Sequence, residues 1–124
     1  TDWVPDGLQV EDVVKFVNAA KAHGIHFVDV STGGLVVADI PVAPGYQVPF
    51  ATQIKRETGL PTIAAGLITE PVQAETILRS GDADIIDIGR AMLRDPRWGW
   101  NAARALGVKG LTMPNNVAFG YRGL

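Results

Sequence analysis

Three short apolar segments, which alternate with helical patterns and end near glycines, constrain the fold of this chain more than any other feature. Strands are expected over residues 25–31, 60–65 and 83–88, and helices over residues 10–23, 50–58 and 71–78. β-Branched residues favour strands in the short segments, whereas apolar residues at i, i+3, i+4 and i+7 favour helices. This alternation is typical of right-handed βαβ units that build a parallel sheet.

Glycine, proline and small polar residues predict where these elements end. Gly24 should stop the first helix, and Thr69 is the expected N-cap of the third helix, with Pro71 in its first turn. A further helix is expected over residues 96–106, and the tail from residue 107 onward should be irregular.

The length of the chain limits the architectures that fit this α/β pattern. Open parallel sheets usually contain about four to six strands, and a complete (β/α)8 barrel needs about 250 residues. This chain has 124 residues and three convincing strands. It is therefore expected to be a piece of a larger α/β fold, either a doubly wound sheet or a barrel.

Charge and composition exclude several classes of partner. The chain has 11 Lys and Arg residues against 13 Asp and Glu residues, a net charge of −2 and no cysteine. Nucleic acid and anionic membrane surfaces select basic patches, which are missing here, and no apolar run approaches the length that spans a bilayer. The absence of cysteine excludes a disulfide framework and fits a reducing compartment, so a cytoplasmic protein is expected.

Glycines follow the second and third expected strands at Gly66 and Gly89, and Arg90 comes next. Where glycine lets the backbone approach closely, free N–H groups form anion sites, and barrels often hold a phosphate after strands seven and eight. The guanidinium group of Arg90, at the turn after the third expected strand, also suits a phosphate. Either glycine alone is explained by a strand-to-helix turn, but the pair in consecutive βα units predicts a phosphate site.

His23 and His26 are three residues apart but are not expected to act together, because Gly24 separates a helix end from a strand start. Barrel chemistry collects at the opposite, carboxyl ends of the strands, so neither histidine is predicted to be catalytic or to bind metal. Asp29 and Asp87 lie within strands that are expected to be buried on both faces. Each should therefore have a structural hydrogen-bond donor.

Five motifs occur in a defined order between residues 27 and 106, namely VDVSTGG, PGYQVPF, AAGLIT, ADIIDIGR and LRDP. In this order they resemble the C-terminal half of Old Yellow Enzyme family ene-reductases, most closely the bacterial thermophilic-like branch of NADPH dehydrogenases. The resemblance implies strands six to eight of a (β/α)8 TIM barrel over residues 1–106, with residues 107–124 as a C-terminal tail.

The resemblance also implies FMN as the cofactor, NAD(P)H as the reductant and reduction of the C=C bond of α,β-unsaturated carbonyl compounds. By position, Gly66 and Leu67 would offer backbone N–H groups to the FMN phosphate, and Gly89 with Arg90 would complete the cradle. Arg122 in the tail would reach the substrate pocket of a neighbouring subunit in a homo-oligomer.

The family's proton donor, carbonyl anchor and flavin-modulating residues belong to its N-terminal half and have no counterpart in this sequence. The N-terminal half is therefore the expected partner, and the isolated chain is expected to be inactive. Two alternatives stay open at this point: part of a phosphate-binding barrel isomerase or synthase, and a non-catalytic half-barrel that self-associates.

Overall fold

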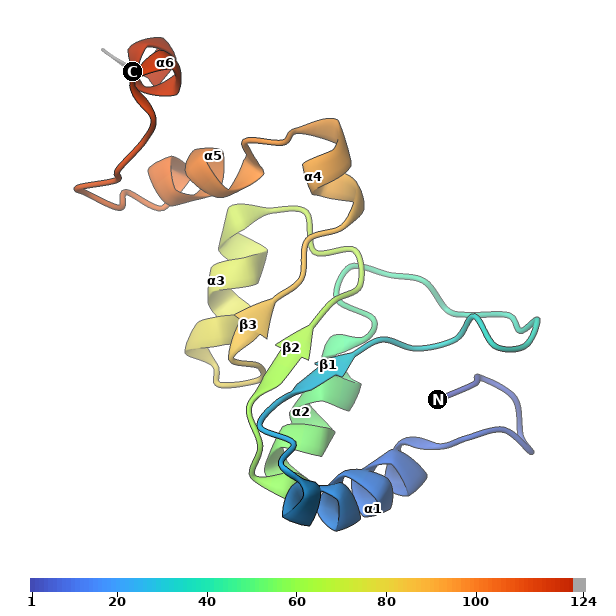
Figure 1. The fold of residues 1–124 in the computed structure, drawn as a ribbon. Coiled ribbons are helices and arrows are strands. Elements are labelled where there is room, and N and C mark those ends of the chain that lie inside the picture. The colour runs from blue at the N-terminus through green and yellow to red at the C-terminus, as the bar shows by residue number, and fades with distance from the viewer. Residues whose placement is uncertain (122–124) are drawn as a thin grey trace.

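The computed structural model describes residues 1–121, and it forms a small parallel sheet flanked by helices (Figure 1). In chain order its elements are α1 (Val10–Ala20), η1 (Lys21–His23), β1 (Val28–Val30), α2 (Val48–Thr58), β2 (Thr62–Ala64), α3 (Pro71–Arg79), β3 (Ile85–Ile86), α4 (Arg90–Arg94), α5 (Trp98–Ala105), α6 (Asn115–Ala118) and η2 (Phe119–Tyr121). The expected mixed α/β fold with a parallel sheet is confirmed.

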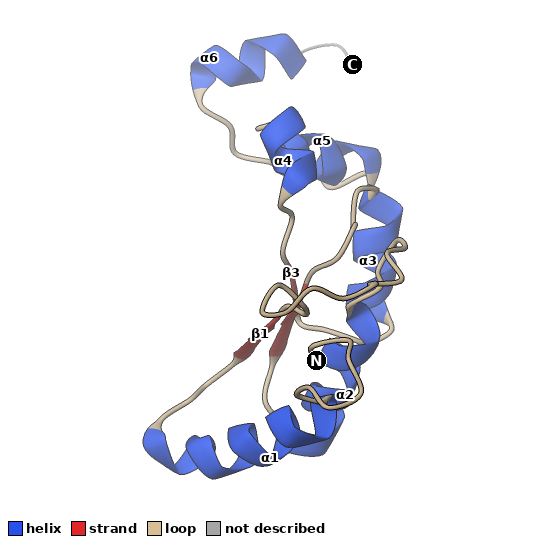
Figure 2. Cartoon of the chain, turned by 90° about the vertical axis from the view of Figure 1, so that its right-hand side faces the viewer, coloured by secondary structure: helices blue, strands red, loops and turns tan. Residues whose placement is uncertain are grey.

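The three strands lie in the order β1-β2-β3, and both pairs are parallel. In the register of the sheet, Asp29 is opposite Ile63, which is opposite Ile85 in turn. Helices α2 and α3 connect successive strands and lie on the same side of the sheet (Figure 2). Consecutive βα units therefore bring the carboxyl ends of the strands, and the loops that follow them, to one edge.

The hydrophobic core lies between the sheet and the helices that cover it. Helix α1 contributes the apolar residues of its i, i+4, i+7 face, and it packs on α2. The buried cluster consists of Val10, Val14, Val30, Ala51, Ile54, Ala64, Ile68, Ala74, Ile77 and Ala83. Trp98 of α5 packs against this cluster.

The opposite face of the sheet is uncovered within residues 1–121. Phe27 is 56% exposed and Ile85 is 52% exposed, although both are large apolar side chains at or beside the sheet. Asp29 and Asp87 are exposed as well. The prediction that these two carboxylates are buried is wrong, because alternate residues of a strand point to opposite faces and only one face is covered by helices.

Some element ends also differ from the sequence predictions. Glu70, not Thr69, is the N-cap of α3, with Pro71 in the first turn as expected. The helix expected over residues 96–106 is shorter, Trp98–Ala105, and Asp95, which precedes a proline, takes the extended conformation that ends α4 before it. The turn expected at Arg90 instead begins the short helix α4, and α6 and η2 occupy the tail that was expected to be irregular.

Asp84, which directly precedes β3, links the amino end of β3 to the amino end of β2. Its carboxylate accepts a hydrogen bond from the backbone N–H of Thr62 at 2.9 Å and forms an ion pair with Lys55 at 3.0 Å. The Thr62 N–H, followed by the Lys55 ammonium group, holds the pKa of the Asp84 carboxyl below its usual value. This contact lies at the edge of the sheet opposite the loops that form the candidate site.

Candidate functional site

The loops after β2 and β3 meet in a cavity of about 170 Å³ at the carboxyl edge of the sheet. All four residues that the sequence pointed to, Gly66, Leu67, Gly89 and Arg90, line this cavity. They come from two segments more than 20 residues apart in the sequence, and the parallel pairing of β2 with β3 brings these segments together. The position at the end of parallel strands is where α/β folds commonly bind ligands.

The turn after β2 has an unusual backbone. Gly66 has a φ of +109° and Leu67 a φ of +50°, so two consecutive residues lie at positive φ. A Cβ atom on Gly66 would stand 3.1 Å from the backbone nitrogen of Gln47 and 3.1 Å from Cδ1 of Tyr46. Both the backbone conformation and the space behind it therefore require glycine at this position.

The cavity offers backbone donors and positive charge. Within residues 1–121, no group accepts a hydrogen bond from the backbone N–H of Gly66, Leu67, Gly89 or Arg90. Two arginines, Arg90 and Arg94, line the cavity together with one acidic residue, Asp87. Free N–H groups next to guanidinium groups are the donors that a phosphate group prefers, so the residues present fit a phosphate.

The remaining walls come from residues that sequence reasoning did not assign to the site. Tyr46 and Gln47, in the loop before α2, line the cavity, and so does Arg94. Loops as long as the one before α2 are often functional, and the i, i+4 spacing of Arg90 and Arg94 would have indicated a shared helix face. Because the sequence predicted a turn at Arg90, that second signal was not available.

A hydrogen bond from α5 holds the loop that carries the turn. Nε1 of Trp98 donates to the backbone carbonyl of Thr69 at 2.8 Å, and the Thr69 N–H donates to Oε1 of Gln73 at 3.2 Å. Thr69, which follows the Gly66–Leu67 turn, is thus hydrogen-bonded to both α3 and α5. These contacts leave the N–H groups of the turn itself available to a ligand.

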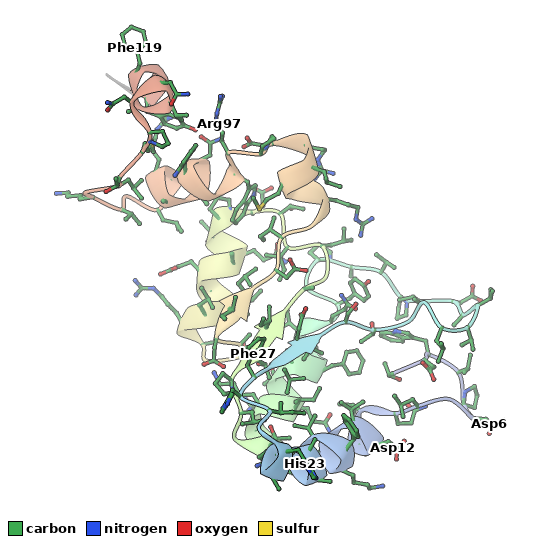
Figure 3. The ribbon with its side chains drawn as sticks, in the orientation of Figure 1. Asp6, Asp12, His23, Phe27, Arg97 and Phe119 are labelled. Atoms are coloured by element: carbon green, nitrogen blue, oxygen red, sulfur yellow. The ribbon has the colours of Figure 1, made fainter. Side chains whose placement is uncertain are left out.

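The two histidines lie away from this cavity. His23 ends η1, and Figure 3 shows it at the end of the molecule opposite Arg97 and the helices α4 and α5. His26 precedes β1, and both side chains are exposed. Neither lines the cavity, which agrees with the expectation that they do not share a site with it.

We therefore expect His23→Ala and His26→Ala, singly or together, to change the turnover of the complete protein by less than about threefold, or about 0.65 kcal/mol of barrier. Separate measurement of kcat and KM checks this expectation. A hundredfold loss of kcat with an unchanged fold and unchanged ligand binding at the cavity would contradict the placement of both residues.

Arg122, which was expected to reach a neighbouring subunit, lies outside the described residues. The last described residue, Tyr121, donates a hydrogen bond from its hydroxyl to Oδ1 of Asn101 at 2.7 Å, and its ring lies 6.0 Å from the guanidinium carbon of Arg104.

Among residues 1–121, no helix combines the length and apolar character needed to cross a membrane.

Comparison with known proteins identifies relatives of this fold and site. The family described as NADH:flavin oxidoreductase / NADH oxidase matches residues 1–107. The NADPH dehydrogenase of Geobacillus thermodenitrificans is 53% identical over 122 residues, which cover 98% of this chain and 36% of that protein. The NADPH dehydrogenase of Listeria innocua is 52% identical over 107 residues, 86% of this chain and 32% of that protein.

This chain therefore spans about a third of the length of the curated relatives that it matches. The matches confirm the resemblance that the five motifs indicated. At the level of the family they also confirm the expected cofactor chemistry, FMN with NAD(P)H as the reductant.

Proposed function

Because this chain belongs to the NADH:flavin oxidoreductase / NADH oxidase family, we propose that it supplies the phosphate-binding part of an FMN-dependent ene-reductase. One observation carries the proposal: Gly66, Leu67, Gly89 and Arg90 line a single cavity at the carboxyl edge of the sheet. The bound flavin would supply hydride transfer between NAD(P)H and the C=C bond of an α,β-unsaturated carbonyl compound.

In this proposal, the residues of the chain bind and orient the cofactor and do not perform proton transfer. The N–H groups of Gly66 and Leu67 would donate to phosphate oxygens, and so would Gly89 and Arg90. Charge-assisted hydrogen bonds of this kind are about twice as strong as neutral ones. They would hold the phosphate group of the flavin at the carboxyl edge of the sheet.

The proposed partner of the chain is the N-terminal half of the same enzyme, which would complete a (β/α)8 barrel around strands six to eight. The uncovered sheet face and the much greater length of the relatives support this arrangement. Phe16, on α1, is 68% exposed, and Leu93, on α4, is 83% exposed, so apolar side chains are also exposed beyond the sheet. The proton donor and the carbonyl anchor would come from that half.

We further propose that residues 107–124 form a tail through which Arg122 reaches the substrate pocket of a neighbouring subunit, which requires a homo-oligomer. A cytoplasmic location also stays a prediction. The isolated chain would be inactive, because it carries a cofactor cradle without an acid or a carbonyl anchor.

Replacement of Arg90 tests the proposed phosphate site. In the complete enzyme, Arg90→Ala should weaken FMN binding by about 1.5–3 kcal/mol, because it removes a charge-assisted contact to the phosphate. Discrimination between alkene substrates should change much less. Titration of the apoenzyme with FMN, followed by flavin fluorescence, measures the effect.

Arg97→Ala is a matched control, because Arg97 is an exposed arginine that does not line the cavity. It should leave the FMN dissociation constant unchanged. If Arg90→Ala left FMN affinity intact while substrate selectivity collapsed, Arg90 would belong to the substrate pocket and not to the phosphate site.

A further inference from the structure

Gln47, in the loop before α2, places a buried side-chain amide in the wall of the cavity. The residue is 5% exposed. Its Oε1 atom accepts one hydrogen bond from the backbone N–H of Thr32 and another, at 2.8 Å, from the Thr32 hydroxyl. Because buried polar groups need hydrogen-bond partners, these two bonds tie Gln47 to the loop after β1.

The hydrogen-bonded chain extends from Gln47 through Thr32 to Trp3. The indole Nε1 of Trp3 donates to Oγ1 of Thr32 at 3.0 Å. An indole N–H can only donate and an amide oxygen can only accept, so the hydroxyl accepts from Trp3 and donates to Gln47. The Trp3 ring also packs edge-on against the ring of Phe50, with centroids 5.3 Å apart. Three segments distant in the sequence are thus joined behind the cavity.

The segment that Gln47 anchors lies directly against the turn after β2. The backbone N–H of Gly45 donates to the carbonyl of Gly66 at 2.7 Å. The Cγ and backbone nitrogen of Gln47 lie 3.0 and 3.1 Å from the position that a Cβ on Gly66 would occupy. Gly66 and Leu67 have positive φ, and such backbone, above all at the leucine, persists only where the surrounding structure holds it.

We propose that Gln47 is a positioning residue for the phosphate site, held in place by Thr32 and Trp3. It acts through segment 45–47, which keeps the Gly66–Leu67 turn in the conformation that directs its N–H groups into the cavity. This inference rests on the proposed function, since it requires that the cavity holds the flavin phosphate.

Thr32→Val in the complete enzyme tests the inference, because valine keeps the shape of threonine and removes the hydroxyl that links Trp3 to Gln47. The apoenzyme is titrated with FMN and, separately, with riboflavin, which has the same ring system but no phosphate. We expect FMN affinity to fall about tenfold while riboflavin affinity changes by less than about twofold. A general loss of structure would lower both affinities, so a change in the ratio of the two affinities reports on the phosphate site.

Thr32→Ser restores the hydroxyl and should restore the FMN-to-riboflavin ratio. Gln53→Leu, on α2, is a control that also removes one side-chain hydrogen bond, the one to Glu11 of α1, and Gln53 does not line the cavity. It should leave the ratio unchanged. If Thr32→Val does not fold, Trp3→Phe removes the indole donor while keeping an aromatic ring beside Phe50, and it should lower the ratio in the same direction.

The possible outcomes separate this inference from the proposal on which it rests. Equal losses of FMN and riboflavin affinity would mean that the hydrogen bonds from Trp3 through Thr32 to Gln47 are purely structural, and this result would overturn the inference. If Thr32→Val leaves FMN affinity unchanged while Gly66→Val weakens it, the inference falls but the phosphate site stands. If neither variant affects FMN affinity, the phosphate site is misplaced and both proposals fall.

Discussion

Gly66→Val should weaken FMN binding to the complete enzyme by about tenfold to a hundredfold, as expected from the loss of charge-assisted hydrogen bonds of about 1.5–3 kcal/mol. Gly66 has a φ of +109°, and its new Cβ would come within 3.1 Å of the Gln47 backbone nitrogen. A β-branched residue cannot adopt this conformation without strain. The turn must shift, and the N–H groups that face the cavity shift with it.

A loss of folding would also lower FMN affinity, so this variant needs a control that also places valine at a positive φ. Gly81 has a φ of +76°, lies outside the cavity and has no atom within 4 Å of its would-be Cβ. Gly81→Val should therefore lower thermal stability and leave FMN affinity unchanged. If Gly66→Val showed normal apoenzyme unfolding together with normal FMN affinity, the turn would not be part of the phosphate site.

Expressed alone, residues 1–124 should not form a stable monomer. The side chains of Phe27, Ile85 and Leu93 are exposed, and the outer edges of β1 and β3 are unpaired within the described residues. The rest of the proposed barrel would pair these edges and cover the exposed sheet face. Open strand edges and exposed apolar patches favour association. Sedimentation velocity at micromolar concentration should show self-association or aggregation.

Co-expression with the N-terminal half of the same enzyme should convert this material into a flavin-binding complex. Ile85→Thr in the isolated chain should reduce aggregation, because Ile85 is 52% exposed there. The same change should destabilise the complex, where the side chain would be buried. A compact monomer of residues 1–124 with cooperative unfolding would contradict the view that the chain is part of a larger barrel.

Local features of the sequence determined the order and type of the main elements. The helical period that starts at Val10 and the stop at Gly24 predicted α1 with η1, and three β-branched segments predicted the three parallel strands. Gly66 and Gly89 could be assigned to strand ends, because a strand followed by glycine and a helix is a local pattern. Five motifs in a fixed order predicted the family.

Only the tertiary structure decided which loops meet at the carboxyl edge. Gln47 and Arg94 line the cavity because parallel pairing brings their segments together, and no periodicity in the sequence reports such a contact. The hydrogen bond between Trp3 and Thr32 joins two loop residues 29 positions apart, and no local pattern in the sequence reports it. The strands that carry Asp29 and Asp87 were predicted, but the exposure of these side chains was not. Exposure depends on whether other elements cover that face of the sheet, and a local sequence pattern does not contain this information.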